Sequence, residues 1–260
     1  MRKRPTLIVG IAVIALAALV ASVAVAGTPV TGADGNSQSI DVKIAPKKLS
    51  KTAYTPASLE VTTKVTTTTN PTGLPVPATR VVVDFDKNAK LFTKGLPTCT
   101  TGQLQNTSTE VAEQQCGKAK IGSGRAEALI PVGTKIYPAQ QVVTAYNGVP
   151  QGGRATVLLH TYTTTPLQTT LILNGVISNY NKEGYGPRLD VEVPLIAGGA
   201  GALLEFNVKI DKKFSYKGKK QSFISAKCPN NKKLKARGAF TFKDGEVITA
   251  LSKQSCAQKK

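Results

Sequence analysis

Short stretches of alternating apolar and polar residues recur along this chain, and they predict β-strands. Residues 40–44 alternate strictly, and residues 59–65 alternate with one slip. Successive side chains of a strand point to opposite faces, so each stretch can bury one face and expose the other. Glycine, proline and asparagine separate the stretches, as is typical of turns. The strands predicted in this way cover residues 40–44, 59–65, 80–85, 126–130, 141–146, 155–163, 169–177, 189–193, 202–210, 222–226, 234–242 and 247–251.

About a dozen short strands with little helical periodicity predict an all-β protein. We expect an antiparallel β-sandwich over residues 39–260, built as one unit or as two packed sub-sandwiches that divide near residues 131–140. A closed barrel is the alternative. Asp244-Gly245, between two alternating stretches, predicts the clearest hairpin, because Asp-Gly suits the tight turns of antiparallel strands. The absence of a consistent repeat period argues against a propeller or a solenoid.

One helical interruption is predicted, near residues 103–116. Residues 109–115 include Glu, Val, Ala and Gln, which together tolerate one or two helical turns. Cys99 precedes this segment and Cys116 ends it, so a bridge between them would fasten a helical excursion between two strands.

The chain contains an even number of cysteines, namely Cys99, Cys116, Cys228 and Cys256. In an oxidising compartment such a set forms disulfides. Three pairings are open, and proximity in the sequence favours Cys99–Cys116 and Cys228–Cys256. The second pair also flanks the predicted hairpin at 243–246. A zinc site is disfavoured, because the chain has no C-x-x-C spacing and a single histidine, His160.

Residues 1–26 have the pattern of a secretory signal peptide. Basic residues precede a long apolar run, and Ala24-Val25-Ala26 places small residues where a signal peptidase cleaves. An uncleaved anchor is the alternative, since about 20 apolar residues can span a bilayer. Residues 27–38 are small and polar, and we expect a flexible leader there. No second long apolar run follows, so no integral membrane span is expected after cleavage.

The chain is strongly basic, with 34 Lys and Arg against 15 Asp and Glu. Without the three basic residues of the signal, 31 basic residues remain against 15 acidic ones, a net charge of +16. The densest stretch runs from Lys209 to Arg237. Its candidate contacts for a polyanion are Lys212, Lys213, Lys217, Lys219, Lys220, Lys232, Lys233, Lys235 and Arg237.

A basic exported protein suggests anionic partners outside the cell, such as wall polymers, acidic polysaccharides or anionic lipid surfaces. The alternative is a charged surface that only maintains solubility. Lysine dominates the basic stretch, which suits loose charge attraction better than bidentate phosphate recognition. Specific nucleic-acid binding is not expected, because few aromatic residues are interleaved with the basic ones for base stacking.

The motifs that would indicate catalysis or a metal all fail. Asp84-Phe-Asp86-Lys-Asn88 begins like a calcium loop, but Ala89 and Gly95 stand where that loop needs Gly and Glu. Gly122-Ser123-Gly124 lacks the glycine spacing of a nucleophile elbow. Residues 198–201 lack the lysine and serine of a phosphate loop. We therefore predict no catalytic residue, no metal and no cofactor, and His160 is expected to be structural.

Tyr180 and Tyr185, in the loop from Ser178 to Pro187, are the best candidates for contact with a small ligand. Binding residues are found more often on loops than on strands. The alternative is that they are ordinary turn residues.

One region resembles a pattern in uncharacterised exported proteins of high-GC Gram-positive bacteria. Leu96-Pro-Thr-Cys99, then Cys116, then Gly122-Ser-Gly-Arg-Ala126 is similar to their L-P-x-C, C and G-S-G-x-A elements. The resemblance covers residues 80–130 and implies export, a Cys99–Cys116 bridge and a β-sandwich. It implies no activity.

The favoured interpretation is a secreted or wall-associated non-enzymatic β module that binds anionic wall polymers or a protein partner. A carbohydrate- or ligand-binding module that uses Tyr180 and Tyr185 is the main alternative. A secreted hydrolase with an unrecognised site is a third.

Overall fold

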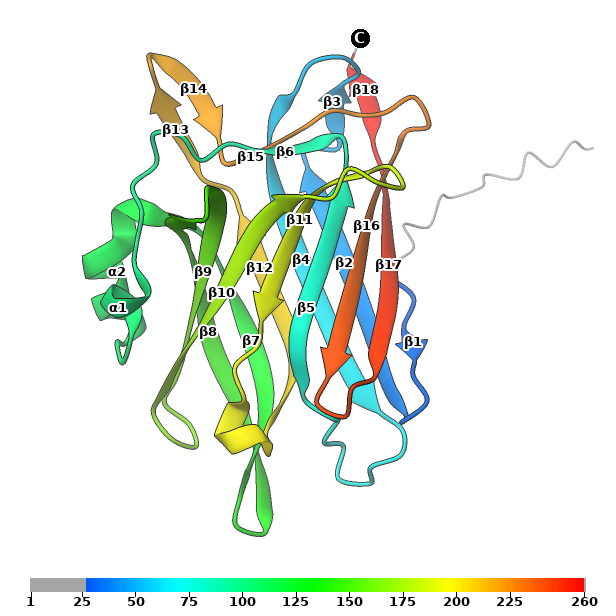
Figure 1. Ribbon diagram of the computed structural model, residues 1–260, viewed down its shortest axis with the longest axis vertical. Coiled ribbons are helices and arrows are strands. Elements are labelled where there is room, and N and C mark those ends of the chain that lie inside the picture. Colours follow the sequence, from blue (N-terminus) through cyan, green and yellow to red (C-terminus); the bar gives the residue numbers. More distant parts are fainter. Residues whose placement is uncertain (1–26, 260) are drawn as a thin grey trace, which may run out of the picture.

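The structure is a computed structural model that describes residues 27–259. The segment expected to be a signal peptide, residues 1–26, lies outside the described residues. Figure 1 shows long antiparallel strands that surround a common interior. No helix among residues 27–259 is long and apolar enough to cross a membrane.

One hydrogen-bonded sheet contains all the long strands, in the order β1-β2-β4-β12-β7-β8-β9-β10-β11-β5-β16-β17. All pairs along this path are antiparallel. The strands are β1 (Val30–Thr31), β2 (Asn36–Ala45), β4 (Thr55–Thr67), β5 (Ala78–Asp86), β7 (Lys120–Val132), β8 (Lys135–Gln151), β9 (Arg154–Thr163), β10 (Thr169–Asn179), β11 (Tyr185–Glu192), β12 (Ala202–Ile210), β16 (Lys233–Phe242) and β17 (Val247–Ser255).

The sheet curls until β17 lies beside β2, and side chains close the gap between them. The Ser252 hydroxyl accepts a hydrogen bond from the Val42 amide at 2.9 Å. The Gln254 amide accepts from the backbone N–H of Ile44 at 2.6 Å and donates to its carbonyl at 2.8 Å. These bonds satisfy backbone groups that would otherwise form a sheet edge. The result is a nearly closed, barrel-like sheet.

The all-β, antiparallel prediction is confirmed, whereas two separate sheets of a sandwich are not seen. The hydrogen-bonded path is continuous from β2 to β17, and side-chain hydrogen bonds bridge the gap between these two strands. Register shifts accompany the curvature, between Lys120 and Gly122 in β7 and between Leu203 and Glu205 in β12. Such bulges increase the local bend and twist of a sheet, which favours closure over two flat layers.

Glycines of β7 allow an unusually close approach of the neighbouring strand. A Cβ atom at Gly122 would lie 2.1 Å from the Lys209 carbonyl, and one at Gly124 would lie 1.9 Å from the Asn207 carbonyl. Both carbonyls belong to β12, so the G-S-G sequence has a structural reason within this sheet.

The helical interruption predicted near residues 103–116 is confirmed. It consists of α1 (Thr101–Leu104), α2 (Thr109–Cys116) and a 3₁₀ turn, η1 (Gly117–Ala119). The Thr100 hydroxyl and the Gln103 side chain cap α1 reciprocally. The helices cover the outer surface of β8 and β9, where Tyr146 and Leu158 join a small second core.

Both favoured disulfides are present, Cys99–Cys116 and Cys228–Cys256. The first ties the helical segment to its own start, and the second joins the ends of the β16–β17 hairpin. That hairpin turns at residues 243–246 as predicted.

Six short strands remain, and one end of the barrel holds them. They are β3 (Lys48–Ser50), β6 (Ala89–Leu91), β13 (Lys213–Tyr216), β14 (Lys219–Ser222), β15 (Ile224–Ala226) and β18 (Ala257–Lys259). The segment 27–38 contains β1 and the start of β2, and residues 131–140 form the far part of the β7–β8 hairpin.

Replacing Gln254 with alanine tests the closure of the sheet. Two hydrogen bonds to Ile44 are lost, so the free energy of unfolding should fall by about 1–3 kcal/mol. Urea unfolding measures the change. Lys253→Ala is the control, because Lys253 is on the same strand and exposed, and it should change stability by less than about 0.5 kcal/mol. Equal stabilities of the two variants would mean that the Gln254 bridge does not hold β17 against β2.

Candidate functional site

The end of the barrel that carries the short strands is the candidate site, and we call it the basic end. Backbone hydrogen bonds hold its segments together. β15 pairs with β6 and with the start of β4, and β18 runs parallel to β3. The Cys228 amide donates to the Ser50 carbonyl at 2.8 Å.

Aromatic rings fix the remaining segments of the basic end. The Phe92 ring stacks on Phe214 at 5.9 Å between centroids and meets the edge of Tyr216 at 5.7 Å. These contacts fasten the β13–β14 hairpin to the chain that follows β6. The Tyr54 ring lies under two ammonium groups, Lys90 at 5.1 Å and Lys227 at 5.3 Å. Cation–π contacts of this kind hold lysines in place without neutralising them.

Lysines from several separate segments meet at this end. None of them forms an ion pair within residues 27–259. The exposed lysines of the basic end are Lys47, Lys48, Lys51, Lys87, Lys90, Lys94, Lys213, Lys217, Lys219, Lys220, Lys232, Lys233 and Lys259.

The few carboxylates near the basic end are already engaged. Asp86 is buried and accepts hydrogen bonds from Asn88 and from the Lys235 amide. Glu183 pairs with Arg237 at 2.7 Å, and Asp211 pairs with Lys209 at 3.7 Å. The lysines of the basic end therefore have a strong, uncompensated positive field.

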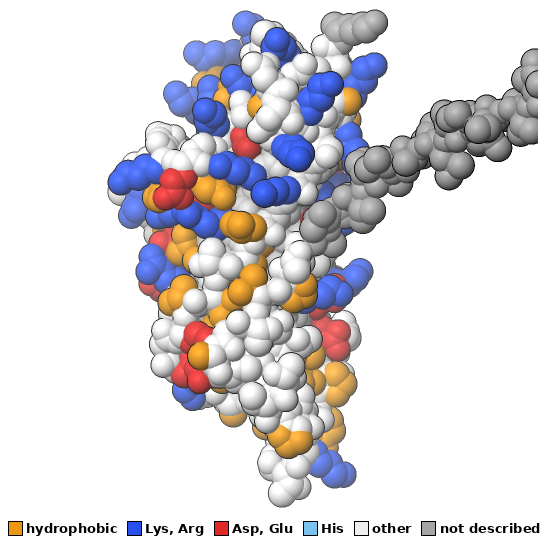
Figure 2. All heavy atoms as spheres, turned by 90° about the vertical axis from the view of Figure 1, so that its right-hand side faces the viewer, with side chains coloured by type: hydrophobic (Ala, Val, Ile, Leu, Met, Phe, Trp, Pro, Cys, Tyr) orange, Lys and Arg blue, Asp and Glu red, His pale blue; other side chains and the backbone are white. Residues whose placement is uncertain are grey.

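The opposite end of the barrel carries negative charge. Asp34 lies near Asp244 and Glu246, and its pKa is raised by desolvation and by repulsion from these two carboxylates. Figure 2 shows Lys and Arg side chains gathered at the upper end of the molecule, with most acidic side chains below them. Charge is thus separated along the long axis.

Most of the lysines predicted as polyanion contacts lie at the basic end. Lys213, Lys217, Lys219 and Lys220 are on the β13–β14 hairpin, and half-buried Lys212 precedes it. Lys233 begins β16 at the same end, and Lys232 directly precedes it.

Lys235 and Arg237, the other two predicted contacts, are engaged within the chain. The Lys235 ammonium donates to the Glu183 carbonyl at 2.5 Å. The Arg237 guanidinium pairs with Asp84 at 2.8 Å as well as with Glu183.

The lysines of residues 47–51 and 87–94 were missed by the sequence analysis. They come from segments far from residues 209–237, and only the pairing of β3, β6, β15 and β18 brings them to the same end. Their density along the chain is not unusual, so charge clustering in the sequence did not indicate them.

Asp84 organises a second charged cluster on the outer face of the sheet. Its carboxylate is 3% exposed and accepts from Arg188 at 2.6 Å and from Arg237 at 2.8 Å. Burial acts to raise the pKa of Asp84, but the hydrogen bonds from both arginines outweigh it and hold the pKa below its usual value. The calcium-loop resemblance at residues 84–88 is thus accounted for by ion pairs and a turn.

The two loop tyrosines lie in this cluster. The Tyr180 ring is 3.9 Å from the Arg188 guanidinium and 5.5 Å from that of Arg237. The Tyr185 ring is 7% exposed and contacts Arg237 at 4.8 Å and Lys235 at 4.4 Å. Cations of the same chain therefore occupy ring surface that a sugar would need.

The other candidate residues of the sequence lie apart from one another. His160 is fully buried beneath the helical segment, where its Nε2 lies 3.1 Å from the Thr107 carbonyl, and burial lowers its pKa. Ser123 is exposed on β7. This strand lies beside β8 in the sheet, whereas the helical segment covers β8 and β9. Among residues 27–259, no group of three or more His, Cys, Asp or Glu side chains is arranged to hold a metal ion.

Comparison with known proteins returned nothing: no family model, no curated protein and no solved structure matches this chain.

Replacing Asp84 with asparagine tests the charged cluster. Two guanidinium groups would lose their counter-charge, so the free energy of unfolding at pH 7 should fall by about 3 kcal/mol. An aspartate with a lowered pKa stabilises the fold above its unfolded pKa of about 3.9, and this contribution disappears as the pH falls through the lower folded value. The gap between the wild type and Asp84→Asn should therefore be constant from pH 5 to 7 and shrink below pH 4.

Asp190→Asn is the matched comparison for that measurement. Asp190 pairs with Arg80, whose side chain is 54% exposed, so its loss should cost less than about 1 kcal/mol. Chemical unfolding at several pH values gives both results. Equal losses in the two variants would contradict the central role of Asp84.

Proposed function

We propose that this protein is a non-enzymatic module of the cell exterior that binds anionic wall polymers through its basic end. The observation that carries the proposal is the convergence of exposed, unpaired lysines from several separate segments on one end of the barrel. A charged surface that served solubility alone would need no such convergence.

The chemistry of the basic end favours a flexible polyanion over a compact ligand. Lysine ammonium groups on long, flexible side chains attract charge without demanding a fixed geometry. The lysines extend over the β13–β14 hairpin, β3, β6 and the start of β16, so they form a surface spread over several segments. A polymer with repeated negative charges can contact many of them at once.

The distribution of charge also supports an oriented attachment. The acidic group Asp34, Asp244 and Glu246 at the other end would be repelled by the same polymer. Long-range attraction and repulsion then align the barrel with its basic end towards the wall.

Export is part of the proposal. The signal-like residues 1–26 and two disulfides support an oxidising compartment outside the cytoplasm. The rigid, cross-linked barrel would hold the basic end as one surface.

Retention on isolated bacterial cell walls in a NaCl gradient tests the proposal. The triple variant Lys217→Gln, Lys219→Gln, Lys220→Gln should elute at clearly lower NaCl than the wild type, because screened charge attraction depends on the number of contacts. The control triple variant, Lys64→Gln, Lys135→Gln, Lys243→Gln, removes the same charge from exposed residues outside the basic end. It should elute close to the wild type.

Two outcomes would overturn the proposal. Absence of wall retention at low salt would remove the polymer as a partner. Equal shifts of the two triple variants would show that net charge alone governs retention and that the basic end is not a binding surface.

A further inference from the structure

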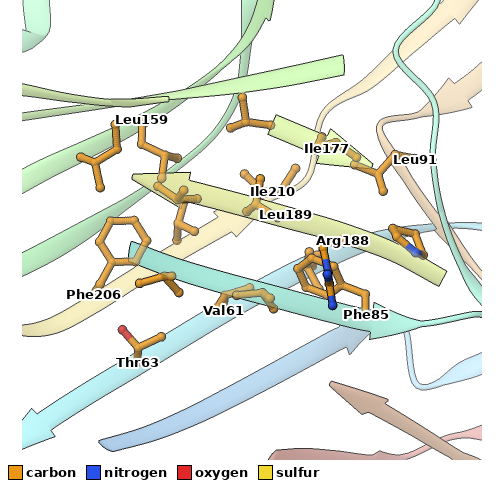
Figure 3. Close-up of a pocket in the computed structure, with 18 of the residues that line it drawn as sticks. Val61, Thr63, Phe85, Leu91, Leu159, Ile177, Arg188, Leu189, Phe206 and Ile210 are labelled. Atoms are coloured by element: carbon orange, nitrogen blue, oxygen red, sulfur yellow. The ribbon is translucent and has the colours of Figure 1, made fainter. Parts of the chain in front are cut away.

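The barrel encloses an apolar cavity that the proposed function does not use. Its volume is about 120 Å³, and it lies between β4 and β12 on one side and β5, β9, β10 and β11 on the other. Figure 3 shows Leu159, Phe206, Ile210 and Val61 around this space. Nearly all of the lining atoms are apolar, and Thr63 contributes one hydroxyl.

This space is large for the interior of a folded protein. Cores pack as densely as organic crystals and seldom contain voids larger than a water molecule. Apolar cavities of about 150 Å³ stay dry and bind small hydrocarbons such as benzene. Here Val61, Val81, Leu189 and Phe206 face the interior and still remain only half-buried. The cavity is therefore suited to an apolar ligand and not to water.

A second, smaller space continues the cavity towards the end opposite the basic end. It measures about 20 Å³ and shares Leu173, Val193, Leu203 and Phe206 with the main cavity. At the end of the main cavity nearest the basic end, the lining residues are Leu91 and Ile224. The combined space is elongated along the barrel, which fits a narrow alkyl chain better than a flat ring.

The far end of this elongated space is apolar as well. Gln141 and Thr161 are among its lining residues, but carbon atoms form its accessible surface. The Thr161 hydroxyl donates to the Leu171 carbonyl at 3.4 Å. A ligand in this space would therefore make contacts with carbon atoms only.

The ligand is expected to be uncharged. Arg188 is among the lining residues of the main cavity, but its guanidinium already pairs with Asp84 at 2.6 Å. A carboxylate in the cavity would therefore be desolvated without a free counter-charge.

The chain that follows β11 covers this end of the space. Ile196 is buried in the lining, and Ala197, Gly198 and Gly199 have positive φ angles of 48°, 66° and 90°. Glycine adopts such angles readily, so a short, tightly turned cover over the cavity is possible here. The Lys243 ammonium donates to the Gly199 carbonyl at 3.2 Å and fastens this cover to the β16–β17 turn.

We infer that the barrel interior binds a small uncharged lipid, with an alkyl segment of about six to eight carbons between the strands. The segment length follows from the comparison of about 120 Å³ with cavities that hold six-carbon ligands. This site is separate from the lysines of the basic end, so either proposal can fail without the other.

Calorimetric titration of the purified protein with 1-octanol tests the inference. We expect saturable binding of one molecule per chain. Sodium octanoate at pH 8 should bind at least about tenfold more weakly, because its carboxylate would lose hydration in the apolar space. No binding of 1-octanol up to its solubility limit would overturn the inference.

Variants locate the alkyl chain. Val61→Phe and Val81→Phe fill the cavity from opposite walls, and each should abolish 1-octanol binding. The melting temperature identifies the variant that retains the fold, and either one alone suffices. Undiminished binding in a folded filled variant would place the ligand elsewhere and overturn the inference.

Discussion

Closure of a single sheet on itself is the constraint on which the rest of the structure depends. Ser252 and Gln254 of β17 bond to backbone groups of Val42 and Ile44 in β2, and these side chains replace a regular backbone ladder. Closure decides which face of every strand lies inside. It also brings the C-terminal strand β18 beside β3, with which it pairs. The interior and the basic end both follow from this arrangement.

The circumference of the barrel explains why its interior is incompletely filled. Around eight strands give a barrel that side chains can just fill. The ring here runs through β2, β4, β12, β7, β8, β9, β10, β11, β5, β16 and β17. It is lined largely by Val, Leu and Ile, and the chain contains no tryptophan. Aliphatic side chains of this size meet across part of the ring and leave an apolar space in the rest.

The strands and disulfides were predictable because their signals are local. Alternation within residues 40–44 or 202–210 depends only on neighbours in the sequence, and it corresponds to β2 and β12. Cys228 and Cys256 flank an Asp-Gly hairpin, and antiparallel strands bring hairpin ends together. The β13–β14 hairpin was not anticipated as a separate unit. Its Phe214 and Tyr216 pack on Phe92 from a distant segment, a contact without a local signal.

The sequence by itself determined the all-β character, the positions of the long strands, the helical interruption and both cysteine pairs. It also determined the excess of lysine, although not its location. Only the tertiary structure decided that the strands form one nearly closed path, that lysines of residues 47–51 and 87–94 join those of residues 213–233, and that Arg237 is neutralised by Asp84. The reason is physical: strand formation and hairpin pairing depend on nearby residues, whereas closure, charge convergence and an internal cavity depend on contacts between residues far apart in the chain.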